Sequence, residues 1–230
     1  MNNLEKSPQE SLLVVIDPQK GFVDEDGSFA KAFGTEELIK IQEAIAKTGK
    51  FIAEMPNGVR VMFVRSEYQI NQFAEEGPLS ELCVSGLNHD CEWSDRISIP
   101  PNTKIITKED NDACETREFV DAISNSVRED VSRVIIAGCT TTSCVKETAL
   151  SIKELFPELD VIVSMDLVGA RSLHYKSTKQ EDKTLANIEG DNEEDLEYFG
   201  EDSSNVAAIL DEFWTKGISI GTSNKIKFSK

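Results

Sequence analysis

An α/β domain with a mostly parallel, six-stranded sheet covered by helices on both faces is the fold that this sequence predicts. Apolar runs of strand length alternate along the chain with segments of helical period. Such alternation requires crossover connections, which join parallel strands. A length of 230 residues suits a single domain, which we assign to residues 1–230.

The expected strands are short apolar runs bounded by turn-forming or charged residues. The first, at residues 12–16, is continuously apolar and ends at Asp17 and Pro18, as a buried parallel strand followed by a turn would. The other five are expected at residues 59–64, 104–107, 134–137, 161–164 and 218–220, with the last at a sheet edge.

The expected helices carry apolar residues three or four positions apart. The clearest has an apolar face that runs from Cys144 to Leu155 and stops before Pro157. The apolar positions of the others are Leu38, Ile41 and Ile45; Phe119, Val120, Ile123 and Val127; and Val206, Ile209, Leu210 and Phe213.

Two segments do not follow this alternation. Residues 66–103 have weak periodicity and several turn formers, so we expect a long surface connection near the site. Residues 189–205 hold eight acidic residues and no basic one. A solvated or partly disordered loop is the favoured interpretation, and a lid or a docking surface for a basic partner is the alternative.

The charge balance argues against two classes of partner. The net charge is −18 and the pI is about 4.5. Nucleic acids and anionic membranes are also negative, so we expect the chain to bind neither without specificity. The aliphatic runs are too short to span a membrane, and the N-terminal residues lack the pattern of a secretory signal. We therefore expect a cytoplasmic protein.

The chain has five cysteines, an odd number, and no two of them form a CxxC motif. Free thiols in a reducing compartment are the simplest expectation. A disulfide between Cys83 and Cys91 is the alternative.

Three reactive side chains follow expected strands. Asp17 comes directly after the first strand and Lys108 after the third, while Cys144 lies in the first turn of the helix after the fourth. In parallel α/β sheets, ligands bind at the carboxyl ends of the strands, where loops lead into helices. We therefore expect these three side chains to meet.

Together these residues suit nucleophilic catalysis. The helix N-terminus and the Lys108 ammonium are expected to lower the pKa of Cys144, whose thiolate is the reactive form. Asp17 would orient Lys108 or take the thiol proton during attack on a carbonyl carbon. The main-chain N–H groups of residues 140–144 would form an oxyanion hole, and water would then release the acyl-enzyme.

Each residue also has a simpler interpretation. Asp17 could merely end a strand, and Lys108 could be a solvated charge in a polar segment. Cys144 could be a small buried residue on an apolar helix face. For each residue taken alone, the simpler interpretation is the more common one. Only the placement of all three residues at strand ends gives a catalytic role the same weight as the simpler interpretation.

Three motifs resemble those of the isochorismatase-like cysteine hydrolases. Residues 14–24, VVIDPQKGFVD, resemble the opening motif of an apolar strand, Asp, one residue, Gln, two residues and an aromatic. Residues 105–108, IITK, resemble the strand that ends at the catalytic lysine. Residues 135–149, IIAGCTTTSCVKETA, resemble the signature of a strand, Gly, five residues, Cys-Val, two residues and Thr-Ala. The resemblance spans about residues 11–220.

The resemblance implies a Rossmann-like three-layer α/β/α sandwich that assembles as a homo-oligomer and acts on a small-molecule substrate. The catalytic triad that it implies is Asp17, Lys108 and Cys144. The residues that it implies for the oxyanion hole are Cys139, Thr140 and Cys144, with a cis peptide bond between the first two. In the opening motif, Gln19 and Phe22 are expected to bind the substrate.

The sequence also departs from the family. Nicotinamidases of this superfamily bind a metal through Asp-x-His and a further His after the second strand, but residues 65–69 read RSEYQ. Because the chain has only His89 and His174, we predict no metal and no cofactor. Cys114 stands where phenylalanine is common, which leaves the shape of the pocket wall open. Residues 189–205 look like an insertion.

The predicted function is that of a metal-independent cysteine hydrolase, an amidohydrolase that cleaves a C–N bond of a small amide or ureido substrate. Isochorismatases cleave a vinyl ether and do not need the cysteine, so Cys144 favours amide chemistry. Two alternatives are vinyl ether hydrolysis and a non-catalytic scaffold or binding protein. A redox role for Cys144 is a weaker third.

Overall fold

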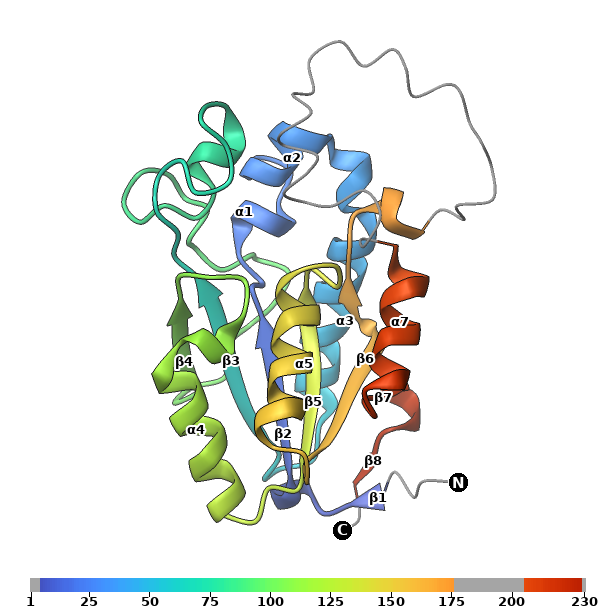
Figure 1. Ribbon diagram of the computed structural model, residues 1–230. Helices are drawn as coiled ribbons and strands as arrows, with labels where there is room; N and C mark the ends of the chain where they lie inside the picture. The colour runs from blue at the N-terminus through green and yellow to red at the C-terminus, as the bar shows by residue number, and fades with distance from the viewer. Residues whose placement is uncertain (1–4, 176–204, 229–230) are drawn as a thin grey trace.

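The central sheet has six strands, all parallel, in the spatial order β4-β3-β2-β5-β6-β7 (Figure 1). The computed structural model describes residues 5–175 and 205–228. The six strands are β2 (Ser11–Ile16), β3 (Arg60–Ser66), β4 (Lys104–Lys108), β5 (Arg133–Cys139), β6 (Asp160–Gly169) and β7 (Ser219–Gly221). The predicted six-stranded α/β sheet is thereby confirmed.

Helices cover both faces of the sheet and complete three layers (Figure 1). Helices α4, α5 and α7 pack on one face and α3 on the other, while α1 and α2 lie beyond the carboxyl ends of the strands. The helices are α1 (Lys20–Val23), α2 (Ser28–Phe33), α3 (Ile39–Glu54), α4 (Arg117–Arg128), α5 (Cys144–Leu155) and α7 (Val206–Thr215). Short 3-10 turns lie at Pro8–Glu10, Thr35–Leu38, Pro78–Glu81, Ala113–Glu115, Ser172–Tyr175 and Ser223–Lys225.

Strand β2 lies inside the sheet and is buried on both faces. Leu12, Val14 and Ile16 face the side of α4 and α5, whereas Leu13 and Val15 face the side of α3. From β2 the chain moves outward to β3 and β4, and then returns to β5 on the other side of β2. Open α/β sheets bind ligands at such a reversal of strand order. The sheet therefore places a binding site between the carboxyl ends of β2 and β5.

Strand β6 is ten residues long, whereas only residues 161–164 were expected. Its pairing with β5 shifts register between Ile136 and Gly138. The charged Asp166 interrupts the apolar pattern that the sequence prediction followed. Within the fold its carboxylate accepts hydrogen bonds from the Ser223 N–H at 2.8 Å and from the Ser164 hydroxyl at 3.0 Å, which offsets its partial burial.

The connection between β3 and β4 is packed more deeply than the surface loop that was expected for residues 66–103. Its spacing of apolar residues follows neither a helix nor a strand, so the sequence pattern did not indicate burial. Its buried hydrophobic residues join the core cluster on the side of α3 and are Tyr68, Phe73, Leu79, Leu82, Cys83 and Ile97. The acidic segment 189–205 lies, except for Asn205, outside the described residues.

A second small sheet pairs β1 (Glu5–Lys6) in parallel with β8 (Lys227–Phe228). Strands of two residues leave no periodic pattern, so the sequence could not predict them. None of the helices in the described ranges is long and apolar enough to cross a membrane.

Candidate active site

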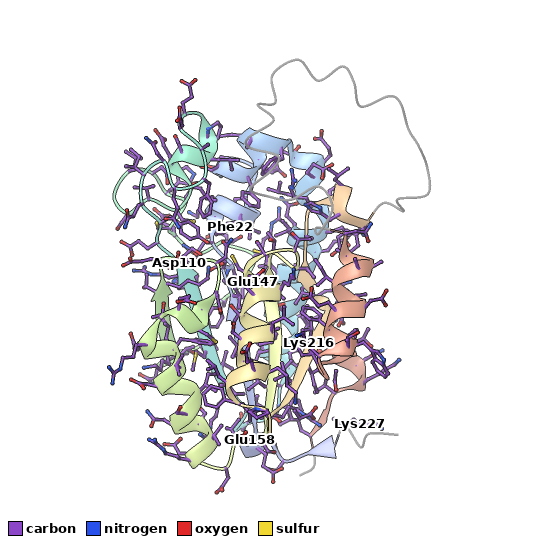
Figure 2. All side chains as sticks on the ribbon, viewed as in Figure 1. Phe22, Asp110, Glu147, Glu158, Lys216 and Lys227 are labelled. Carbon is purple, nitrogen blue, oxygen red and sulfur yellow. The ribbon has the colours of Figure 1, made fainter. Side chains whose placement is uncertain are left out.

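The carboxyl ends of β2, β4 and β5 bring the three expected catalytic residues together. Asp17 directly follows β2, Lys108 is the last residue of β4, and Cys144 is the first residue of α5. Figure 2 labels Phe22 and Asp110 at this end of the sheet. The three side chains therefore meet at one edge of the sheet, as their places after the strands predicted.

Lys108 links the other two side chains. Its Nζ lies 3.0 Å from Asp17 Oδ2 and 3.4 Å from Cys144 Sγ. The side chains of Asp17 and Lys108 are 0% exposed, and Cys144 is 2% exposed. An ammonium, a carboxylate and a sulfur thus share one buried site, where charges interact more strongly than in water.

The Lys108 ammonium is a fixed positive charge. Burial lowers the pKa of Lys108, but the Asp17 carboxylate and the Cys144 sulfur outweigh this effect and raise that pKa to about 12. The ammonium also donates to Ser66 Oγ at 2.7 Å and to the carbonyl oxygen of Asp110 at 2.9 Å. Lys108 therefore stays protonated at neutral pH and cannot serve as the base.

Burial raises the pKa of the Cys144 thiol to about 11, and the opposing attraction of Lys108 does not offset it. The nearby Asp17 carboxylate raises the Cys144 pKa as well. The sequence had led us to expect a lowered pKa, and this expectation was wrong because a residue's depth of burial cannot be read from its place in a motif. In the resting site Cys144 is a thiol, whose Sγ donates to Asn111 Oδ1 at 3.5 Å.

The Asp17 carboxylate is placed to accept the proton of that thiol. Its Oδ2 lies 3.0 Å from Lys108 Nζ, and the carboxylate also interacts with the Cys144 side chain. The main chain holds Asp17 at a φ of 50°, with its N–H bonded to the Val64 carbonyl oxygen at 2.9 Å. Aspartate tolerates this left-handed conformation better than most residues. An acceptor for a proton thus stands beside the buried thiol.

The turn between β5 and α5 begins with a cis peptide bond between Cys139 and Thr140. The main-chain N–H groups of this turn that already donate to carbonyl oxygens are those of Thr141, Ser143 and Val145. Within the described structure, the N–H groups of Thr140, Thr142 and Cys144 make no such bond in this turn. Cys139 itself belongs to β5, and its Sγ donates to the carbonyl oxygen of Asp17 at 3.0 Å. The available donors are therefore those of Thr140, Thr142 and Cys144, and they include the two N–H groups, of Thr140 and Cys144, that the family resemblance implies for the oxyanion hole.

Gly138 allows β5 to approach the end of β2 at this turn. Its φ is +111°, and a Cβ at this position would lie 2.0 Å from the carbonyl oxygen of Ile16. No other residue type fits such a distance, so the glycine before the turn is a requirement of the site's geometry.

Three further polar residues of the site were not predicted. Tyr68 and Asn111 lie within hydrogen-bond distance of the Cys144 sulfur, and Ser66 contacts the Lys108 ammonium. Ser66 is the last residue of β3, two positions beyond the strand end that we expected at residue 64. The strand-end rule applied to the expected strand would have pointed to Arg65, one residue short of Ser66. Tyr68 and Asn111 lie in irregular segments, where sequence pattern gives no direction for a side chain.

Gln19 and Phe22, which were expected to bind the substrate, differ in what they contact. The Gln19 amide is fully buried, accepts from the Ser66 N–H at 2.6 Å and donates to the Ser66 carbonyl oxygen at 2.8 Å. This geometry favours a structural role for Gln19, which fixes the end of β3. The buried Phe22 ring lies 6.5 Å from the Tyr68 ring, centroid to centroid, and so stands beside the site.

The side chains at the end of β3 are not suited to bind a metal ion. The hydroxyls of Ser66 and Tyr68 lie 2.7 Å and 3.2 Å from the Lys108 ammonium, whose charge would repel a second cation. His89 pairs with an aspartate on the surface, and His174 accepts a hydrogen bond from an arginine. Across the described ranges, no group of three or more His, Cys, Asp or Glu side chains is arranged to hold a metal.

The other four cysteines are free thiols, and their pKa values are shifted in different directions. Burial raises the pKa values of Cys83, Cys114 and Cys139. A hydrogen bond from Cys83 lowers the pKa of the half-buried Cys91. Cys114, at the position where the family often has phenylalanine, packs against the core cluster on the side of α4 and α5. We therefore expect thiol reagents to label Cys91 as well as Cys144.

Solved structures of known proteins share this architecture. The protein PnC1 of L. infantum, in complex with nicotinate, superposes with a TM-score of 0.67 at 14% identity over 98% of both chains. The pyrazinamidase of Pyrococcus horikoshii, in complex with zinc, gives a TM-score of 0.62 at 19% identity over 93% of this chain and 99% of its own. A nicotinamidase and pyrazinamidase of Acinetobacter baumanii gives 0.61 at 18% identity over 96% and 100%. At such identities the likeness establishes the fold alone.

The family follows from the sequence comparison. The comparison with curated proteins found no match. The model of the isochorismatase domain, however, matches residues 11–188, which is most of the chain and includes Asp17, Lys108 and Cys144. The chain belongs to the isochorismatase family and is a hydrolase of that family.

Proposed function

We propose that this protein is a metal-independent amidohydrolase that uses Cys144 as its nucleophile. The observation that carries the proposal is the position of the Lys108 ammonium, 3.0 Å from Asp17 Oδ2 and 3.4 Å from Cys144 Sγ in a buried site. The substrate is a small molecule with a C–N bond at a carbonyl carbon, either an amide or a ureido compound. The pyrazinamidase activity named for one structural neighbour is amide hydrolysis, and the nicotinate bound to another is a carboxylate, the kind of product that such hydrolysis releases.

The first half of the reaction forms an acyl-enzyme. Asp17 takes the thiol proton while the Cys144 sulfur attacks the carbonyl carbon, and the Lys108 ammonium stabilises the developing thiolate. The oxyanion of the tetrahedral intermediate accepts hydrogen bonds from the N–H groups of Thr140 and Cys144. When the C–N bond breaks, the proton held by Asp17 passes to the nitrogen, and an amine or ammonia leaves.

The second half of the reaction restores the enzyme. Asp17 takes a proton from water, whose oxygen attacks the thioester carbon. The C–S bond then breaks, the sulfur recovers the proton from Asp17, and a carboxylic acid is released. The buried thiol suits this cycle, because a carboxylate that receives and returns one proton keeps the number of charges in the site constant.

Turnover of a panel of small amides and ureido compounds tests the proposal. We expect the wild type to hydrolyse at least one member, to do so after treatment with a metal chelator, and to show an acyl adduct by intact-protein mass spectrometry. Cys144→Ser should lose both the activity and the adduct. Cys114→Ser, which removes a thiol that is not among the polar groups found around the Cys144 sulfur, is the matched control and should keep them.

The outcomes separate the candidate functions. If Cys144→Ser keeps most of the wild-type rate of hydrolysis, the assignment of Cys144 as the nucleophile is contradicted. Cleavage of a vinyl ether by that variant would support the isochorismatase-type alternative. A panel without any turnover would favour a scaffold. We further propose a homo-oligomer that acts in the cytoplasm, and light scattering during size-exclusion chromatography tests the oligomeric state.

A further inference from the structure

Tyr68 places a phenol hydroxyl among the polar groups of the site. Its oxygen lies 3.6 Å from Cys144 Sγ and 3.2 Å from Lys108 Nζ. It also lies 2.8 Å from Ser66 Oγ and 3.4 Å from Asn111 Oδ1. No sequence motif pointed to this residue, and the triad chemistry described above does not use it.

The direction of the hydrogen bonds follows from the charge of Lys108. An ammonium can only donate, so Ser66 Oγ accepts from Lys108 at 2.7 Å. The Ser66 hydroxyl proton then points to the oxygen of Tyr68, where Ser66 is the donor. With its oxygen accepting from Ser66 and facing the ammonium, Tyr68 directs its own proton to one of two remaining acceptors, Asn111 Oδ1 or Cys144 Sγ.

The protonation state of Cys144 decides between these two acceptors. While Cys144 is a thiol, its own proton points to Asn111 Oδ1 at 3.5 Å, and the sulfur is a weak acceptor. Once the proton has left, the thiolate carries a full charge and can only accept. A hydrogen bond from a neutral donor to an ionised acceptor is roughly twice as strong as one between neutral groups. Loss of the thiol proton therefore favours the bond from Tyr68 to the sulfur.

We propose that Tyr68 is a catalytic residue that donates a hydrogen bond to the Cys144 thiolate as the thiol proton passes to Asp17. The proposal rests on the proposed function, because it concerns the same nucleophile. Lys108 supplies charge to the sulfur, and Tyr68 supplies a directed proton that stays on its own oxygen throughout. The chain Lys108, Ser66, Tyr68 and Cys144 thus links the ammonium to the nucleophile by donors that all point the same way.

Packing holds the phenol ready for this role. The Tyr68 ring is 4% exposed and meets the Phe73 ring edge to face at 4.6 Å, with Phe22 on another side at 6.5 Å. The Tyr68 N–H donates to the Cys83 carbonyl oxygen at 3.0 Å, which anchors the main chain. Burial raises the pKa of Tyr68 well above its ordinary value, so the hydroxyl keeps its proton at neutral pH. A fixed and protonated phenol needs little reorganisation when the thiolate forms.

Tyr68→Phe tests the proposal, because it removes the hydroxyl and keeps the ring that packs on Phe73. The rate of iodoacetamide labelling is measured from pH 6 to pH 11 in the intact chain, and peptide mapping separates Cys144 from the competing Cys91. We expect the Cys144 profile to move to higher pH and labelling at pH 7.5 to slow by roughly 10- to 100-fold, the range for one hydrogen bond to a charged group. Cys91 labelling should not change.

Tyr175→Phe is the matched control. The Tyr175 hydroxyl accepts from the Ala170 N–H at 3.3 Å, and the polar atoms found around the Cys144 sulfur do not include it. This variant should keep the wild-type Cys144 profile, and both variants should keep a wild-type melting temperature to within a few degrees. An active substrate from the amide panel should show a loss in kcat for Tyr68→Phe with little change in KM.

Labelling and turnover distinguish the failure of this proposal from the failure of the proposed function. Labelling needs no substrate, so an unshifted Cys144 profile in Tyr68→Phe overturns the role of Tyr68 even if the wild type hydrolyses amides. A fall in the Cys144 labelling rate that Tyr175→Phe shares also overturns it, since the loss of the Tyr68 hydroxyl would then not be the cause. A shift to higher pH that Tyr175→Phe does not share supports the proposal, whatever the panel shows.

Discussion

Replacing Lys108 with methionine tests the buried ion pair that organises the site. Methionine is similarly long and flexible but carries no charge, so the Asp17 carboxylate stays buried without its partner at 3.0 Å. Breaking a buried ion pair by removing one member costs about 3–5 kcal/mol, because the other charge is left uncompensated. In a chain of 230 residues this corresponds to a fall in Tm of roughly 6–20 °C, at about 2–4 °C per kcal/mol.

Differential scanning calorimetry and urea unfolding measure the loss, and Lys104→Met is the matched control on the same strand. Lys104 Nζ lies 2.9 Å from Glu118 Oε1, but these side chains are 48% and 60% exposed. An exposed pair contributes about 0.2–1 kcal/mol, so the control should lose at most about 4 °C in Tm.

A double variant separates charge from packing. Combining Asp17→Asn with Lys108→Met removes both charges and should recover most of the stability that Lys108→Met loses, although the protein would remain inactive. The reasoning is refuted if Lys108→Met unfolds no more easily than Lys104→Met. It is refuted equally if the double variant is less stable than Lys108→Met.

Two other predictions concern backbone geometry and acid stability. Gly138→Ala should lower the free energy of unfolding in urea by more than about 3 kcal/mol, because its Cβ would clash with the Ile16 carbonyl oxygen. Gly221→Ala, whose Cβ would enter open space, should change the free energy of unfolding by less than about 0.5 kcal/mol. Equal stabilities of these two variants would contradict the close approach of β5 to β2. Burial lowers the pKa of His174 from 6.5 to about 4, so the folded protein binds fewer protons than the unfolded chain between these pH values. The free energy of unfolding should therefore fall as the pH drops through this window, and by a smaller amount in His174→Gln. Identical acid profiles of the two proteins would argue against a buried, neutral His174.

The local periodicity of hydrophobic residues was sufficient to predict most of the fold. Continuous apolar runs predicted the six strands because a parallel strand covered on both faces must be apolar throughout. The helix from Cys144 to Leu155 was predicted with its observed bounds, because its apolar face repeats every three or four residues and Pro157 follows. Where polar residues enter a strand, as at Asp166 in β6, the pattern failed and the predicted strand was too short.

The sequence by itself also determined which three residues meet at the site. All strands of the sheet point the same way, so residues that follow different strands arrive at one edge. Asp17, Lys108 and Cys144 follow three such strands, and this rule needs no knowledge of packing.

Only the tertiary structure decided how these residues behave. The pKa of Cys144 rises because segments from all over the chain exclude water from the sulfur, and burial outweighs the attraction of Lys108. Tyr68 and Asn111 reach the sulfur from irregular connections, and Gln19 is held by the main chain of Ser66. Direction along a strand is a local property that the sequence records. Depth of burial and hydrogen-bond partners are sums over distant residues, so they exist only once the chain has folded.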